Sequence, residues 1–118
     1  MRPDVRDQGY LLDMLQHARG VTAAVEGLTL EKYVGNETVR LAVERRIEII
    51  GEAARRVSAA FQEAHPEIPW RKIVAQRHVL AHEYGEIEDE IVWHVATVSI
   101  PALIQLLSPL VSPPDDAD

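Results

Sequence analysis

Apolar residues recur at alternating steps of three and four over most of this 118-residue chain, which is the spacing of one face of an α-helix. In the first such segment, about 4–26, they are Leu11, Leu15, Ala18, Thr22 and Val25. In the longest segment, about 37–65, they are Val39, Val43, Ile47, Ile50, Ala54, Val57, Phe61 and Ala64. No segment of useful length shows the two-residue period of a strand. The pattern therefore predicts an all-α fold.

Capping residues mark the first helix boundaries. Gly27 is expected to end the first helix, because glycine favours the position just after a helix C-terminus. A short helical turn is then predicted between the N-cap Thr29 and Gly35. Asn36 is the expected N-cap of the long second helix over 37–65.

Two further helices follow the connector "HPEIP". The third is predicted to start near Trp70 and to stop near Tyr84. The fourth is predicted over about 89–107, with a kink at Pro101. Because the connections are short, neighbouring helices are expected to run antiparallel, which gives an up-and-down four-helix bundle with one extra helical turn.

The fourth helix predicts the oligomeric state. Its sequence, "IVWHVATVSIPALIQLL", carries almost no charge after Glu90. A helix that is apolar around most of its circumference must be covered on most of it. A four-helix bundle of this size covers about half of such a helix, so a second subunit is needed for the rest. We therefore expect a homodimer.

Composition limits the class of protein. The length fits one domain, expected over 1–108 and followed by a flexible tail over 109–118. The chain has no cysteine, which excludes disulfides and thiolate metal sites. The N-terminal residues "MRPDVRDQGY" lack the apolar core of a signal peptide, and no apolar run seems to approach the 18 residues of a membrane span. Because no apolar run approaches that length, we expect a cytoplasmic protein that does not bind membranes.

Charge is unevenly distributed along the chain. The net charge of −7 disfavours binding to nucleic acid, because phosphate binding is largely electrostatic. Residues 40–78, however, hold eight basic and five acidic residues, so that this span carries +3 and the remainder −10. Arg45, Arg46, Arg55 and Arg56 are interpreted either as a solvated helix face with ion pairs or as a track for an RNA backbone.

The segment "QRHVLAHEY", residues 76–84, concentrates groups that carry chemistry. Successive helical residues turn by about 100°, so Arg77 and His82 are roughly 140° apart on a regular helix. They would converge on one ligand only if the helix loosened near His82, or if a two-fold axis brought in the partner's copy. Spacing alone therefore does not define a site.

Three interpretations of this segment remain open. The first is an ordinary exposed helix surface, since short motifs have many false positives. The second is metal binding, because His78 and His82 have the spacing of helical zinc ligands, followed by Glu83 and Glu86. The third is metal-free phosphodiester cleavage, in which histidine moves protons near neutral pH and arginine holds the phosphate.

A family resemblance favours the third interpretation. "RHVLAHEY" resembles the signature of HEPN-superfamily ribonucleases, specifically the HepT-like toxins: an arginine, four residues, a histidine, one residue and a tyrosine. "AVERRIEIIGEAARRVS", "HPEIPWRKIV" and "EIVWHVATVSIPAL" resemble three further segments of that family in the same order. The resemblance covers about 5–107. It implies a helical bundle that dimerises and brings two motifs into one cleft.

The resemblance also implies residue roles. Arg77 would bind and stabilise the scissile phosphate, and His82 would act as general base or acid. His78 follows the arginine, where the family often has asparagine, and would orient the site or contact RNA. In characterised members an antitoxin transfers AMP to the tyrosine of the motif, which corresponds to Tyr84. The enzyme would need no metal or other cofactor.

Two functions follow, from different classes. The first is a metal-independent ribonuclease toxin of a type VII-like toxin–antitoxin pair, a homodimer that cleaves RNA, has no DNA target and is neutralised by a nucleotidyltransferase antitoxin. The alternative is a HEPN-like dimer that binds nucleotide or the partner nucleotidyltransferase without cutting RNA. The acidic net charge favours this alternative.

Overall fold

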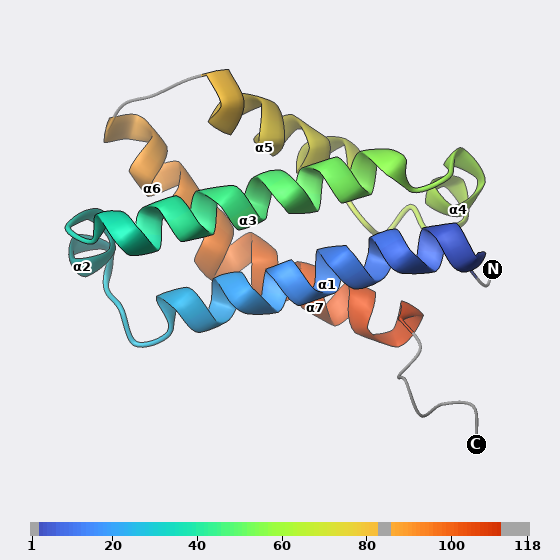
Figure 1. The fold of residues 1–118 in the computed structure, drawn as a ribbon, viewed down its shortest axis with the longest axis horizontal. Helices are drawn as coiled ribbons and strands as arrows, with labels where there is room; N and C mark the ends of the chain where they lie inside the picture. The colour runs from blue at the N-terminus through green and yellow to red at the C-terminus, as the bar shows by residue number, and fades with distance from the viewer. Residues whose placement is uncertain (1–2, 83–85, 112–118) are drawn as a thin grey trace.

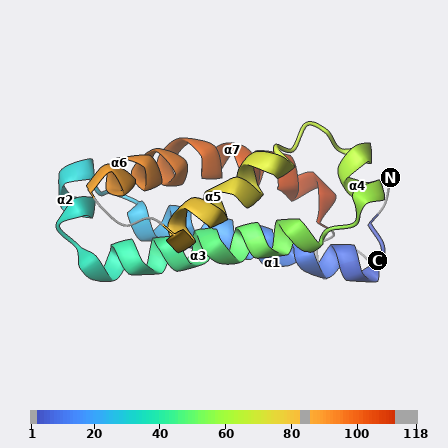
Figure 2. The same ribbon diagram turned by 90° about the horizontal axis from the view of Figure 1, so that it is seen from above.

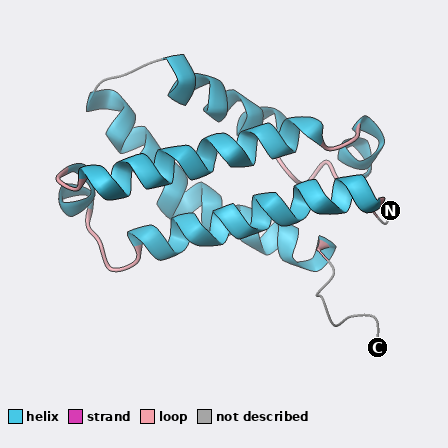
Figure 3. Ribbon diagram, in the orientation of Figure 1, coloured by secondary structure: helices cyan, strands magenta, loops and turns pink. Residues whose placement is uncertain are grey.

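The computed structural model describes the backbone of residues 3–82 and 86–111 and the side chains of residues 3–76 and 89–111. Within these ranges the secondary structure is helical and contains no strand (Figure 3). The predicted all-α fold class is therefore confirmed.

The predicted caps of the early helices are confirmed. α1 covers Val5–Val25, and Gly27 follows it with φ +78°, a left-handed conformation that glycine adopts without strain. α2 covers Leu30–Val34, and its N-cap Thr29 accepts a hydrogen bond from a backbone N–H of the first turn. Asn36 does the same for α3, accepting from Val39 N–H at 3.1 Å.

The prediction of a single helix over 37–65 is wrong, because the helix is interrupted at Val57 and Ser58. α3 covers Glu37–Arg56, and a separate α4 covers Ala59–Ala64. The buried carboxylate of Asp7, at the start of α1, accepts hydrogen bonds from the Ser58 backbone N–H at 2.8 Å and from Ser58 Oγ at 2.6 Å. A long-range partner therefore holds Ser58 in the extended conformation of an N-cap, which helical periodicity does not reveal.

The third and fourth helices differ in detail from their predictions. α5 covers Trp70–His82, and the fourth helix begins earlier than predicted, with α6 at Glu86–His94. It continues through a π-helical turn at Val95–Ser99 into α7, Ile100–Leu107, and a 3₁₀ turn, Ser108–Leu110.

The kink predicted at Pro101 takes the form of this π-helical turn. Proline has no N–H to donate, so the helix interior must reorganise around it. The Ile100 N–H accordingly bonds to the Val95 carbonyl, five residues earlier. The backbone is thus rearranged in the turn before the proline.

α3 lies between α1 and α5. In Figure 1, α1 and α3 lie side by side and run in opposite directions, and α5 packs on the other side of α3. Figure 2 shows α1 and α3 in one layer, with α6 and α7 in the other. α7 and the π-helical turn pack against α1 across the core.

Most of the predicted apolar faces are buried. The buried members are Leu11, Leu15, Ala18, Val25, Val43, Ile47, Ile50, Ala54, Val57 and Phe61. Val39 packs against this core, whereas Thr22 and Ala64 are exposed, so their assignment to the core was wrong. A new helix begins after the interruption at Val57 and Ser58. The spacing of buried residues along α3 therefore does not predict which side of α4 Ala64 lies on.

The fourth helix overturns the expectation about membrane spans. Asp89–Leu110 is one helix of 22 residues with a mean hydropathy of 1.6, so by length and composition it is long and apolar enough to cross a membrane. The core helix of a soluble protein satisfies the same criterion. Only 33% of its apolar window is buried, and Ile91 and Val98 are 48% and 54% exposed. The chain by itself leaves much of this helix uncovered.

The contact between Asp7 and Ser58 generates a stability prediction. Asp7→Ala removes the acceptor of two buried donors, so we expect the free energy of unfolding to fall by about 2–3 kcal/mol in a urea titration. Asp13→Ala, an exposed aspartate on the same helix, is the matched control and should change it by less than about 0.5 kcal/mol. Equal effects of the two variants would contradict this role for Asp7.

Candidate active site

The predicted catalytic motif lies at the C-terminal end of α5. This helix extends to His82, so positions 77 and 82 both belong to it and are about 140° apart around its axis. The side chains of Arg77, His78 and His82 lie outside the described residues, as does all of Tyr84. Their assignment as site residues therefore stays a prediction.

The N-terminal half of α5 is anchored by its tryptophan. Trp70 is 8% exposed, and its Nε1–H donates a hydrogen bond to the His65 carbonyl at 3.0 Å. Its ring packs edge-on against Phe61 of α4, with 6.4 Å between ring centroids. Ile73, one turn later, is also buried. Trp70 is thus a core anchor, and this anchoring fixes the direction in which α5 carries the motif.

A second cluster holds α6, into which the chain passes after the motif. Trp93 of α6 packs against Tyr33 of α2, with ring centroids 5.3 Å apart. Burial raises the pKa of the Tyr33 phenol, so this group is neutral at physiological pH. Arg40 of α3 faces Asp89 of α6 at 3.9 Å. These contacts tie α6 to α2 and α3.

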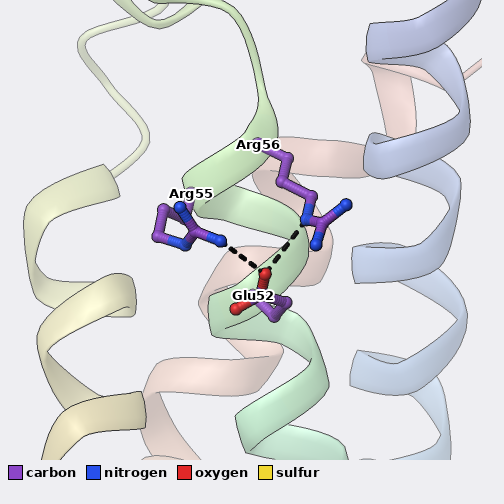
Figure 4. Close-up of polar contacts among 3 residues, drawn as sticks. All are labelled: Glu52, Arg55 and Arg56. Atoms are coloured by element: carbon purple, nitrogen blue, oxygen red, sulfur yellow. Dashed lines mark hydrogen bonds and ion pairs between the residues drawn. The ribbon is translucent and has the colours of Figure 1, made fainter.

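Two of the four arginines considered as an RNA track share one carboxylate. Arg55 Nη2 and Arg56 Nε both donate hydrogen bonds to Glu52 Oε2, at 2.7 and 3.0 Å (Figure 4). These are pairs at i,i+3 and i,i+4 on one helix, and their side chains remain about half exposed. The contacts fit a solvated helix face with ion pairs.

Arg46 has a packing role between α1 and α3. Its Nη1 lies 3.0 Å from His17 Nδ1, and its guanidinium lies over Gly20, where an added Cβ would come within 2.4 Å of it. Burial, and next the nearby charge of Arg46, lower the pKa of His17. Arg45 is the most exposed of the four: its side chain is 72% exposed, and its Nη1 lies 3.9 Å from Glu48 Oε1. The arginines of α3 therefore do not form a continuous basic track.

A groove between α5 and the fourth helix, lined mainly by apolar side chains but with polar ones from both helices, was missed by sequence reasoning. Two adjoining cavities, of about 370 and 450 Å³, share the side chains of Lys72 and Gln76 from α5 with those of His94 and Ser99. Lys72 and Gln76 are four residues apart, a spacing visible in the sequence. His94 and Ser99 are five apart and would diverge on a regular α-helix, so only the π-helical turn could reveal that they share the groove.

The metal interpretation finds no support in the described part of the chain. No group of three or more His, Asp or Glu side chains there could hold a metal ion. The ligands considered in the sequence, His78, His82, Glu83 and Glu86, have side chains outside the described residues. The choice between metal binding and metal-free chemistry thus depends on experiment.

Comparison with known proteins identifies the family. The family model described as ribonuclease HepT-like matches residues 14–110, and the chain belongs to this family. A protein named as a candidate RNase in Methanocaldococcus jannaschii is 31% identical over 96 residues, which cover 81% of this chain and 88% of that protein. A protein of Thermococcus cleftensis named "Probable ribonuclease HepT" is 31% identical over 94 residues, covering 80% and 86%.

A further relative, named as a candidate RNase in Caldanaerobacter subterraneus subsp. tengcongensis, is 34% identical over 94 residues, covering 80% of this chain and 84% of that protein. No solved structure matches the chain significantly. The resemblance seen in the sequence motifs is thus confirmed at the level of the family, and it includes the whole of α5.

Proposed function

We propose that this protein is a metal-independent endoribonuclease that acts as a homodimer. The observation that carries the proposal is the family match over residues 14–110, which contains the complete arginine–histidine–tyrosine motif, with Arg77 and His82 on α5. Relatives that match over four fifths of the chain carry ribonuclease names. The arrangement of the long helices, each antiparallel to the one before it, fits an up-and-down four-helix bundle (Figure 1).

The proposed chemistry needs no cofactor. RNA cleavage requires removal of a proton from the 2′-hydroxyl, delivery of a proton to the leaving 5′-oxygen and stabilisation of charge on the phosphorane. His82 moves protons as general base or acid, and the planar guanidinium of Arg77 binds the phosphate oxygens. His78 orients the site or contacts RNA.

The dimer solves two problems at once. Positions 77 and 82 lie about 140° apart on α5, so one copy of the helix does not direct both toward a single phosphate. The fourth helix meanwhile leaves Ile91 and Val98 about half exposed. A two-fold contact through the fourth helix buries this apolar surface and brings two copies of α5 toward a shared cleft.

The proposed biological role is a cytoplasmic toxin neutralised by a nucleotidyltransferase antitoxin. Transfer of AMP to Tyr84 would place a phosphate charge and an adenosine beside Arg77. The added phosphate would compete with RNA for the guanidinium and block the cleft. No membrane or DNA target is part of this proposal.

The nuclease mechanism predicts that Arg77→Ala and His82→Ala each lower the rate of RNA cleavage by at least about 100-fold. Cleavage is measured on a single-stranded RNA with purified protein, and growth inhibition is measured on expression in cells. EDTA should leave the wild-type rate unchanged. Circular dichroism and thermal unfolding serve as controls for folding.

Two results would contradict this mechanism. Loss of cleavage in EDTA, with recovery on adding zinc, would favour a metal site at His78 and His82. Wild-type protein that binds nucleotide or its nucleotidyltransferase but leaves RNA intact would favour the non-catalytic alternative, which the acidic net charge and the ion-paired Arg55 and Arg56 support.

The dimer predicts that Val98→Glu shifts the protein to monomer in sedimentation velocity at tens of micromolar, because a charge in an apolar interface is costly to bury. Cleavage should be lost together with the dimer. Val5→Glu is the matched control, since Val5 is 89% exposed in the first turn of α1, where a carboxylate is tolerated. A wild-type protein that sediments as a monomer at this concentration would refute the dimer.

The modification predicts a mass change. Co-expression with the cognate nucleotidyltransferase should add one or more AMP units to the wild-type protein, measured by intact mass spectrometry. Tyr84→Phe should abolish the addition, because phenylalanine has no hydroxyl to accept the nucleotide. Unchanged addition of AMP to Tyr84→Phe would place the modification at another residue.

A further inference from the structure

The π-helical turn brings two polar side chains to one side of the fourth helix. In a regular α-helix, residues five apart point roughly 140° away from each other. In a turn closed by hydrogen bonds between residues five apart, as between Val95 and Ile100, such residues lie nearly one above the other. His94 and Ser99, on either side of this turn, accordingly line the same two cavities.

α5 supplies the facing wall. Lys72 and Gln76 are four residues apart on one face of this helix and line both cavities. Ile47 and Ile50 of α3, both buried, form the floor of the inner cavity, which has a volume of about 370 Å³. A lysine and three other hydrogen-bonding side chains therefore converge from two helices over an apolar floor.

The inner cavity is lined mainly by apolar side chains, and Lys72 is its one lysine or arginine among the described residues. Among its described lining residues there is no carboxylate, and Glu90 lines only the outer cavity of about 450 Å³. Lys72 makes no ion pair with any residue of the described ranges. This differs from Arg55 and Arg56, whose charges are already paired with Glu52. Among the described residues, then, no carboxylate pairs with the charge of Lys72.

We propose that Lys72, Gln76, His94 and Ser99 form a binding subsite for a backbone phosphate of the RNA substrate. Position 72 precedes Arg77 by five residues on the same helix, a rise of about 7.5 Å and a turn of about 140°, so this subsite would hold a phosphate other than the one that Arg77 binds. Lysine, glutamine and serine are common donors to phosphate oxygens, and such contacts position a strand without reading its sequence.

This inference rests on the proposed ribonuclease function and is tested by binding. In a His82→Ala background, affinity is measured by fluorescence anisotropy with a single-stranded RNA whose 2′-hydroxyls are replaced by hydrogen at the cleavage site. Lys72→Gln should weaken binding roughly fivefold to tenfold and lower the slope of log affinity against log salt by about 0.7. Lys32→Gln removes the same charge from exposed Lys32 of α2 and should change neither quantity.

A second variant tests convergence on one phosphate. In the same His82→Ala background, Ser99→Ala should weaken RNA binding when Lys72 is present. It should add little to the effect of Lys72→Gln, because two donors to one phosphate are energetically coupled. Fully additive effects would overturn the shared subsite. Sedimentation velocity accompanies each variant, and a Lys72→Gln protein that loses RNA only because it becomes a monomer would assign the groove to the second copy instead.

The remaining outcomes separate this inference from the function on which it rests. If Lys72→Gln and Lys32→Gln both bind RNA as the parent does, the subsite is overturned while the nuclease proposal stands. If no variant binds RNA, the parent included, both proposals fail. If binding of AMP or inorganic phosphate depends on Lys72 while binding of RNA does not, the groove is a site for free phosphate compounds and the RNA assignment is overturned.

Discussion

The burial of both sides of α3 is the constraint on which the rest of the structure depends. α1 packs on one side of this helix and α5 on the other, so α3 sets the direction of the helix that carries the motif. Ile47 and Ile50 contribute at once to the core and to the floor of the groove beside α5. Just after the end of α3, Asp7 of α1 accepts two hydrogen bonds from Ser58, and the chain turns back toward α5. The helix that carries the motif is thus positioned by apolar packing and one buried carboxylate.

The fourth helix links stability to function. It is more apolar than one copy of the chain can cover, and its exposed valine and isoleucine side chains lie on the helix that follows the motif. A second copy can bury the same surface. The arginine and histidine positions on α5 diverge by about 140°, so two copies of the helix are needed to bring both groups to one phosphate. The proposed dimer therefore accounts both for the exposed apolar surface of the fourth helix and for the divergence of the two motif positions on α5.

Pro101 affects the positions of side chains in the helical turn that precedes it. The proline predicts a disturbance in the fourth helix, since it has no N–H for the preceding turn. The disturbance takes the form of a π-helical turn over Val95–Ser99, which places His94 and Ser99 in one groove opposite Lys72. The need for a rearrangement was predictable from the sequence. Its form depended on how the fourth helix packs against α1.

The sequence by itself determined the helical class, the caps at Thr29 and Asn36, most of the buried apolar residues and the family, because these depend on interactions within a few residues or on ordered motifs. Only the tertiary structure decided the break at Ser58, the packing role of Arg46 against His17 and the convergence of Lys72 with His94 and Ser99. Each of these joins residues from separate helices. Local periodicity carries no information about such partners, because they meet only when the helices pack.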